Sequence, residues 1–190
     1  MASKRKTKAS ARIYQIKITL KHVKPPIWRR IEVPGEFTLG RLHEVIQTAM
    51  GWDGGHLHQF TIYGMEYGVP DQDFGMDVEN EDRVTLDRLP LSEKSKFLYH
   101  YDFGDDWVHE ILVEKIIPRV PGQHYPVCVK GKRACPPEDV GGVWGYADFL
   151  KIIADPNHPE HEEMLEWAGG EFDPEVFDLE GVNVMLGHFD

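Results

Sequence analysis

The sequence predicts an α+β fold, in which a mixed or antiparallel sheet carries one helix across a face and further helices follow near the C-terminus. Three observations favour this class. Alternating apolar stretches flank a helical repeat within residues 12–64, residues 96–114 have the pattern of a β-hairpin, and helical repeats return only after residue 145. Strands gathered early and helices gathered late are typical of α+β proteins rather than of parallel α/β proteins.

The chain opens with two predicted strands. Residues 12–20 alternate between polar and apolar side chains, which indicates a strand buried on one face. Pro25 and Pro26 follow, and because proline has no backbone N–H they end the ladder and turn the chain. Residues 27–33 then read as the returning strand.

A helix and a third strand come next. Apolar residues recur at helical spacing over residues 39–50, with Thr38 placed as N-cap and Gly51 where a left-handed C-terminal cap belongs. Residues 57–64 alternate as a strand, and residues 65–82 are expected to be a long loop. The hairpin–helix–strand order resembles the start of a β-grasp sheet.

The stretch YHYDFGDDWVHEI, residues 99–111, is predicted to be a hairpin. A three-residue turn at 104–106 would pair Phe103 with Trp107 and Tyr101 with His109, placing the aromatic side chains on one face. A slip of one residue would mix the two faces. We therefore expect the aromatic side chains, Trp28 and Trp107 among the tryptophans, to be core, with His109 a hydrogen-bonded core histidine.

The last third of the chain differs from the rest in composition. Residues 118–142 are rich in Pro and Gly and are expected to be irregular. Helical patterns then occupy residues 146–154, 159–168 and about 178–187.

Charge is unevenly distributed. The first twelve residues contain five Lys or Arg and no acid, whereas the whole chain has a formal net charge of -11. An acidic body repels phosphate backbones, so nucleic-acid binding by the body is disfavoured. Residues 1–11 are expected to be a disordered, solvated tail whose basic side chains could make weak contact with nucleic acid.

Composition also bears on location. No apolar run reaches the roughly 18–20 residues needed to cross a bilayer, and the first residues lack the apolar segment of a secretory signal. The two cysteines, Cys128 and Cys135, are too few for a disulfide scaffold. A cytoplasmic protein with reduced thiols and no membrane partner is expected.

Two groups of side chains are candidate metal ligands. The hairpin tip presents Asp102, Asp105 and Asp106, whose oxygens suit a hard divalent cation, although a turn favours the same residues for conformational reasons. His56 and His58 would share one face of a strand and could chelate one ion. The alternative is that they are two unrelated histidines, each at the surface or capping an element. No organic cofactor is indicated.

Catalytic candidates are few. His109 or Glu138 could act as a general base and Asp139 could orient it, since the loop PPEDVGG at residues 136–142 is short and rigid. The phosphate-binding GxxxxGK[ST] loop, the GxGxxG turn after a strand and the GxSxG elbow are all absent from the sequence.

Five segments, PPIWRRIEVP, LHEVIQTAMGW, HLHQF, YDFGDDWVHEI and CPPEDVGGVWGYADFL, together resemble the plasmid Orf-3-like family, which is named for an open reading frame of a root-inducing plasmid. The resemblance covers about residues 12–187 and implies a single domain over residues 12–190. It implies that the following motif positions matter, without assigning them a role: Trp28, Arg29, His58, Asp102, Gly104, Asp105, Trp107, His109, Pro136, Glu138, Asp139 and Gly141. Six of these are our candidates for a binding surface: Trp28, Arg29, His58, Asp102, Asp105 and Trp107.

Two functions remain open from the sequence. The first is a non-enzymatic binding module that recognises an unidentified protein partner through an acidic, aromatic-rimmed surface, with a link to mobile elements. The alternative is a metal-dependent hydrolase or nuclease-like enzyme built from the YDFGDDWVH and PPED segments. We further expect Asp105 or Asp106 to accept a hydrogen bond from the PPEDVGG loop.

Overall fold

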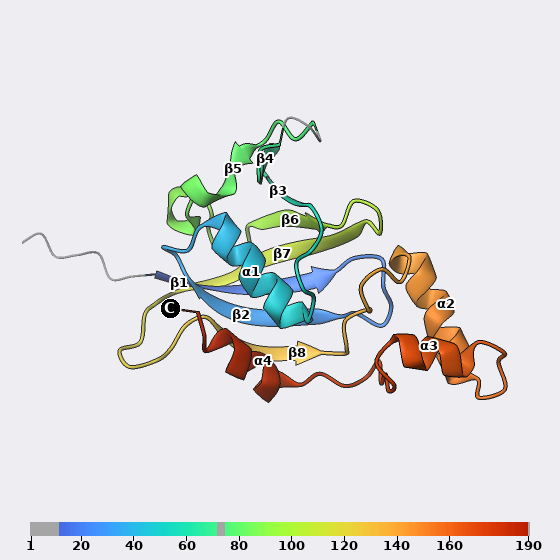
Figure 1. The fold of residues 1–190 in the computed structure, drawn as a ribbon. Helices are drawn as coiled ribbons and strands as arrows, with labels where there is room; N and C mark the ends of the chain where they lie inside the picture. The colour runs from blue at the N-terminus through green and yellow to red at the C-terminus, as the bar shows by residue number, and fades with distance from the viewer. Residues whose placement is uncertain (1–11, 72–74, 190) are drawn as a thin grey trace, which may run out of the picture.

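The protein is built on one mixed sheet. A computed structural model describes residues 12–71 and 75–189, which form an eight-stranded sheet of order β5-β4-β3-β6-β7-β1-β2-β8 (Figure 1). All neighbouring strands are antiparallel except β4 and β5. The strands are β1 Arg12–Leu20, β2 Trp28–Pro34, β3 His58–Ile62, β4 Met65–Gly68, β5 Glu79–Asn80, β6 Lys96–Tyr101, β7 Trp107–Pro118 and β8 Val127–Lys132. The predicted α+β class is confirmed.

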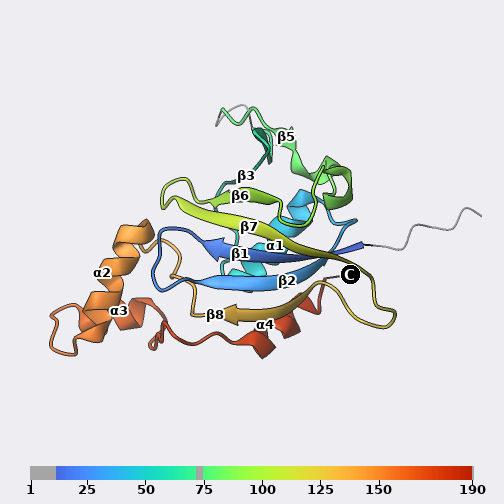
Figure 2. The same cartoon turned by 180° about the vertical axis from the view of Figure 1, so that it is seen from behind.

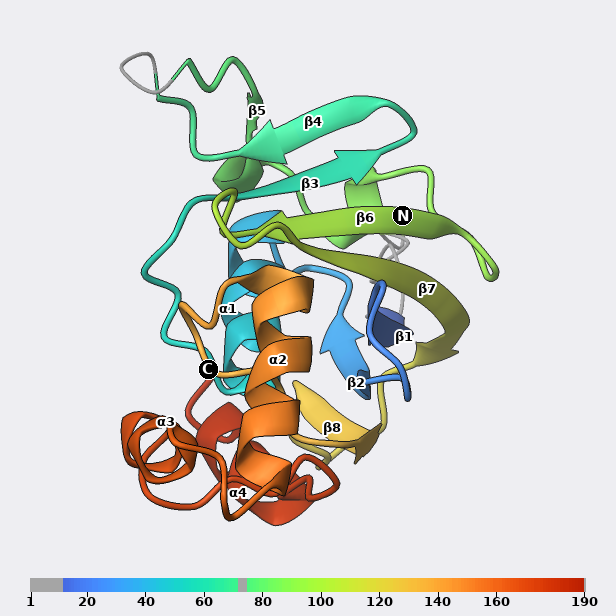
Figure 3. The ribbon, with the colours of Figure 1, turned by 90° about the vertical axis from the view of Figure 1, so that its right-hand side faces the viewer.

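The helices cover one face and one end of the sheet. They are α1 Leu39–Met50, α2 Gly142–Ala154, α3 His161–Trp167 and α4 Leu179–Leu186, with short 3₁₀ turns at Glu81–Arg83 and Leu86–Arg88. Helix α1 lies across the sheet with α4 beside it in front of β8 (Figure 1), and seen from behind no described helix crosses the opposite face (Figure 2). Helices α2 and α3 stand at the sheet end that carries the β6–β7 loop (Figure 3).

Helix α1 forms as its sequence predicts. The Thr38 side chain accepts a hydrogen bond from the backbone N–H of Arg41 at 3.1 Å, and Gly51 ends the helix with a φ of 92°. Its apolar side chains, Leu42 and Val45 among them, are fully buried against the sheet. The helix is held by burial of this stripe, which supplies more stability than intrinsic helix propensity does.

The topology departs from a β-grasp sheet after the first three elements. Strands β1 and β2 form the expected hairpin and α1 follows it. Strand β3, however, does not reach β1, because β6 and β7 lie between them and β7 pairs with β1. The hairpin predicted from the aromatic pattern therefore occupies the centre of the sheet.

That central hairpin has a register two residues away from the predicted one. Tyr101 pairs with Trp107 and Tyr99 with His109, so the connection is a five-residue loop at 102–106. Because side chains alternate with a period of two, a two-residue shift leaves each strand residue on its predicted face. Trp107, Tyr99 and Tyr101 are buried as expected.

Phe103 is the aromatic residue that the predicted register placed wrongly. Predicted on the core face, it lies in the loop and is 39% exposed. Asp102 closes the loop instead, since its backbone oxygen accepts from the N–H of Asp106 at 2.7 Å and its side chain accepts from the N–H of Gly104 at 2.9 Å. These local bonds stabilise a longer turn than the three-residue one, and Phe103 turns outward.

Trp28 is also less buried than predicted. It lies on the face of the sheet that α1 does not cover, because the neighbouring Arg29 points to the α1 side and strand side chains alternate. Its ring is half-buried between two cations, with Lys17 Nζ 4.9 Å and the Arg30 guanidinium carbon 5.4 Å from its centroid.

Three strands appear where loops were expected. Strands β4 and β5 lie within residues 65–82, and β8 lies within the Pro- and Gly-rich region 118–142. At the outer edge of β8 the side-chain amide of Asn183 in α4 accepts from the backbone N–H of Cys128 at 2.8 Å and donates to its oxygen at 2.9 Å. A helix distant in sequence thus completes the hydrogen bonding of this edge strand, which local composition does not reveal.

Two predictions concern the chain ends and location. The expected disordered tail at residues 1–11 lies outside the described residues. Within the described part of the chain, no helix has the length and apolar character required to cross a membrane. The cytoplasmic location stays a prediction.

Candidate functional site

Three loops meet at the end of the sheet that faces α2. They are the loop before β3 (residues 51–57), the hairpin tip (102–106) and the loop before α2 (133–141). Hydrogen bonds join them pairwise: Asp102 N–H to Leu57 O at 2.9 Å, Asp53 N–H to a Glu138 carboxylate oxygen at 2.9 Å, and Gly141 N–H to Asp105 Oδ2 at 3.1 Å. The arrangement brings the two segments of greatest sequence interest, YDFGDDWVHEI and PPEDVGG, into direct contact.

The hairpin tip and the PPEDVGG loop are locked as expected. Asp105 accepts the hydrogen bond from Gly141, which confirms the prediction for that aspartate. Gly142 packs so closely on the tip that a Cβ atom there would overlap the backbone oxygen of Asp105. Asp106 turns away, with an oxygen 2.8 Å from His100 Nε2.

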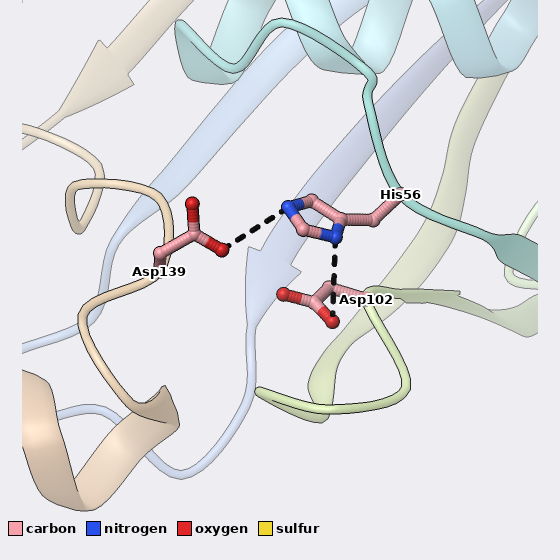
Figure 4. Close-up of side chains that lie close together, drawn as sticks. All are labelled: His56, Asp102 and Asp139. Carbon is pink, nitrogen blue, oxygen red and sulfur yellow. Dashed lines mark ion pairs between the residues drawn. The ribbon is translucent and has the colours of Figure 1, made fainter.

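One cluster of ligand-type side chains lies at the meeting point of the loops. His56 places Nε2 3.2 Å from Asp139 Oδ1 and Nδ1 3.8 Å from Asp102 Oδ1 (Figure 4). One nitrogen and one oxygen from each carboxylate all lie within 4.8 Å of one another. Asp102 is buried, whereas the Asp139 side chain is 71% exposed, so the cluster is open on one side.

Neither of the two predicted sets of metal ligands comes together in the structure. The three aspartates of the tip do not converge. Asp105 accepts a hydrogen bond from Gly141, Asp106 lies beside His100, and Asp102 alone faces the cluster. The reason is the longer loop, which points successive carboxylates in different directions.

The histidine pair separates for a related reason. His56 lies in the loop, and β3 begins only at His58, so the alternation that would place both rings on one face does not apply. His56 faces Asp102 and Asp139, while His58 Nε2 bonds to both oxygens of the buried Glu81 at 3.0 and 2.9 Å. The two rings do not share a ligand position.

His58 belongs to a second, buried polar network. Its ring stacks on that of His43 with centroids 3.5 Å apart, and His43 Nδ1 lies 2.7 Å from the hydroxyl of Tyr99, which also accepts from Gln47 at 2.7 Å. Burial, and secondarily the neighbouring His58, lowers the pKa of His43 to about 3. The sequence did not predict that His43, Glu81 and Tyr99 form one network, because no motif links a helix, a 3₁₀ turn and a strand.

His109 is a core residue. It is fully buried, its Nδ1 lies 3.1 Å from the backbone oxygen of Trp107, and burial lowers its pKa to about 3. Its Nε2 has no hydrogen-bond partner among the described residues. A neutral imidazole enclosed on all sides does not reach a substrate, which favours the structural interpretation made from the sequence.

Glu138 is engaged as a structural acceptor. One carboxylate oxygen accepts from the Tyr101 hydroxyl and the other from the backbone of Asp53. Burial, together with the hydrogen bond to Glu138, raises the pKa of Tyr101 and keeps its hydroxyl a donor. Asp139, next in the chain, is the carboxylate of the PPED segment that faces His56 instead.

Most candidates for a binding surface are not on the surface. Trp107, Arg29, His58 and Asp102 are all buried, Trp28 is half-buried on the uncovered sheet face, and Asp105 is partly exposed at the hairpin tip. The four buried side chains pack within the fold and are not available to a partner at the surface.

Arg29 joins three elements. Its guanidinium donates to the backbone oxygens of Ala49 at the end of α1, at 2.8 Å, and of Lys132 in β8, at 3.1 Å, and it stacks on the ring of Phe177. Burial lowers its pKa. A cation at a helix C-terminus is stabilised by the helix dipole, which explains a buried arginine here without a carboxylate.

Comparison with known proteins places the chain in a family. Residues 12–181 match the profile of the plasmid pRiA4b ORF-3-like protein. The chain belongs to the plasmid pRiA4b ORF-3-like family. Its match spans all three loops of the candidate site and the whole of α1, as the five sequence segments implied.

Two relatives match this family member over most of their length. An uncharacterised protein of Sinorhizobium fredii, y4hQ, is 44% identical over 160 residues, which are 84% of this chain and 82% of the relative. The crystal structure of a protein of unknown function from Methanosarcina mazei is 39% identical with a TM-score of 0.82, and the match covers 90% of this chain and 98% of the other. Neither relative is described by an activity, so function must be argued from the site itself.

Proposed function

We propose that this plasmid pRiA4b ORF-3-like protein is a non-enzymatic interaction module that binds a partner protein through a groove beside the candidate site. The partner segment would carry Lys or Arg side chains next to apolar ones. The observation that carries the proposal is Trp144, whose side chain is 85% exposed at the edge of that groove.

The groove lies between the hairpin tip and α2. Its volume is about 790 Å³, and it is lined by residues 22–24 of the β1–β2 turn, residues 104–106 of the tip and the first turns of α2. Val143, Ala147 and Leu150 of α2 supply an apolar floor beside Trp144. Large aromatic side chains left in water at the rim of a groove are typical of interaction sites.

Charge favours a basic partner. Asp105 and Asp106 line the groove. Asp148, one helical turn from Trp144 on α2, lies outside the lining and is paired with Lys151 at 2.7 Å, so the acidic character of the groove comes from the hairpin tip. Lys24 and His22 are the basic residues of the lining, and the whole chain carries a formal net charge of -11. An exposed indole beside carboxylates suits a lysine or arginine, which can stack on the ring and pair with an acid.

The state of the catalytic candidates also supports a binding role over a hydrolase. His109 is enclosed in the core, and both oxygens of Glu138 are used by Tyr101 and Asp53. A general base has to reach the proton it removes, and these two groups are committed elsewhere. A link to mobile elements rests on the family name alone and stays part of the proposal.

The test is a binding measurement with defined peptides. A fluorescein-labelled basic peptide, GLKRLVKRLG, is titrated with the full chain and its anisotropy recorded, alongside the acidic peptide GLEELVEELG. We expect the basic peptide alone to bind, with an affinity that falls as salt is raised. Trp144→Ala should weaken binding by about tenfold or more, as is usual for an aromatic anchor at an interface.

Trp167→Ala is the matched control. Trp167 is also exposed, at 47%, but lies on α3 outside the groove, so its removal should leave the affinity unchanged. Equal affinity of wild type and Trp144→Ala, or binding of both peptides alike, would overturn the proposal. A partner captured at one-to-one stoichiometry by wild type and lost with Trp144→Ala would identify the natural ligand.

A further inference from the structure

We infer that His56, Asp102 and Asp139 form a binding site for one divalent transition-metal ion, of the zinc or manganese class. The inference does not depend on the proposed peptide groove. It rests on three features: the spacing of the ligand atoms, the charge of a buried carboxylate and the chemistry of the donor set.

The spacing is close to that of a metal centre. Ligand atoms about 2.0–2.2 Å from one ion are separated by roughly 2.9–3.4 Å in octahedral or tetrahedral geometry. His56 Nε2 and Asp139 Oδ1 already lie 3.2 Å apart, and all three ligand atoms lie within 4.8 Å. The remaining gap, from 4.8 Å to about 3.4 Å, is at most about 1.4 Å and would have to be closed by rotation of the loop side chains of His56 and Asp139.

Asp102 is a buried carboxylate that lacks a strong cationic partner. Its side chain is 12% exposed, and among the described residues the only basic side chain within ion-pair distance is His56, at 3.8 Å. Its carboxylate accepts a hydrogen bond from the backbone N–H of Gly104 at 2.9 Å. Burying a carboxylate without a compensating charge is costly, and a metal ion beside it removes that cost.

A wholly structural alternative exists for the same geometry. A protonated His56 could bridge Asp102 and Asp139 through its two ring nitrogens, as Figure 4 draws them. The bridge is loose on the Asp102 side, since 3.8 Å exceeds hydrogen-bond length. The experiment below separates the two.

The donor set selects the class of ion. One imidazole nitrogen with two carboxylates suits zinc, manganese and other first-row divalent ions, whereas calcium and magnesium prefer all-oxygen sites. Three protein ligands, one of them on the exposed Asp139, leave coordination positions open to water.

Such an ion would join all three loops of the site. His56 comes from the loop before β3, Asp102 from the hairpin tip and Asp139 from the loop before α2. Asp102 and Asp139 each lie two residues from a residue that lines the groove, Gly104 and Gly141. Metal binding would therefore stiffen two walls of the groove.

The test is calorimetric titration of the chelator-treated full chain with ZnCl₂, MnCl₂, MgCl₂ and CaCl₂, in the absence of peptide. We expect zinc or manganese to bind at one ion per chain and magnesium and calcium to bind about tenfold or more weakly. His56→Gln, Asp102→Asn and Asp139→Asn should each lower the affinity by about tenfold or more.

Asp106→Asn is the control within the same loop, because its side chain is 73% exposed and faces His100. Its metal affinity should equal that of wild type. A second readout is thermal: zinc should raise the Tm of wild type and of Asp106→Asn, and should not raise that of Asp139→Asn, whose exposed side chain can change without unfolding the chain.

Two outcomes would overturn the inference. One is the absence of one-to-one binding by any of the four ions, which leaves the histidine bridge as the explanation. The other is binding that survives all three ligand variants, which would mark adventitious binding by other histidines of the chain. Because the peptide assay can be run with chelator present, failure of this site and failure of the groove are distinguishable.

Discussion

Replacing Gly142 with alanine should separate the hairpin tip from α2. Gly142 begins α2 with a φ of 67°, a conformation that costs an L-residue about 1–2 kcal/mol. The added methyl would also overlap the backbone oxygen of Asp105 and lie 3.3 Å from its carbonyl carbon. The loops must then move apart, and the hydrogen bond from Gly141 to the Asp105 carboxylate is lost, at about 1.5–3 kcal/mol for a charged acceptor.

The expected loss of stability is therefore about 2.5–5 kcal/mol, or a fall in Tm of about 5–20 °C at this chain length. Denaturant and thermal unfolding, followed by circular dichroism, measure it. Gly75→Ala is the matched control, because Gly75 has a φ of 68° and a Cβ there would meet no described residue within 4 Å. It should cost only the backbone part, about 1–2 kcal/mol. Equal destabilisation by the two substitutions would show that the contact between the hairpin tip and α2 contributes nothing to the stability of the fold.

Two other predictions concern the core. His43 and His109, whose pKa values lie near 3, stay neutral in the fold while the unfolded chain takes up protons below pH 6.5; stability should therefore fall by about 2 kcal/mol for each between pH 7 and pH 5. Urea unfolding at the two pH values tests this, and a pH-independent midpoint would contradict it. Trp107→Ala should cost about 3–5 kcal/mol because the ring is 1% exposed. Trp28→Ala should cost less, since its half-buried ring faces the uncovered side of the sheet; equal Tm losses would show that this face is covered.

Helix α1 and the two faces of the central hairpin could be read from the sequence. Thr38 and Gly51 cap the helix through their own immediate neighbours, and the apolar stripe between them repeats every turn. The faces of β6 and β7 follow from the alternation of side chains, which survives the error of two residues in register. The register itself was missed because Asp102 prefers a bond to its own loop over a place in the strand.

The candidate site was only partly predictable. The Asp105–Gly141 bond was anticipated because crowded carboxylates need donors and the PPEDVGG loop offers backbone N–H groups. The grouping of His56 with Asp139 was not, since these residues are far apart in sequence and neither lies in a helix or strand whose period could align them. Loops have no repeating geometry, so the direction of a loop side chain depends on what packs against it.

The sequence by itself determined the α+β class, helix α1, the buried faces of the central strands and the family. These depend on periodicity, on caps and on short motifs, all of which act between residues close in the chain. Only the tertiary structure decided that β6 and β7 occupy the centre of the sheet, that Asn183 completes the edge of β8 and that His58 pairs with Glu81 rather than with His56. Each of these is a contact between distant segments, set by how the buried surfaces fit together, and such a fit leaves no local pattern in the amino-acid order.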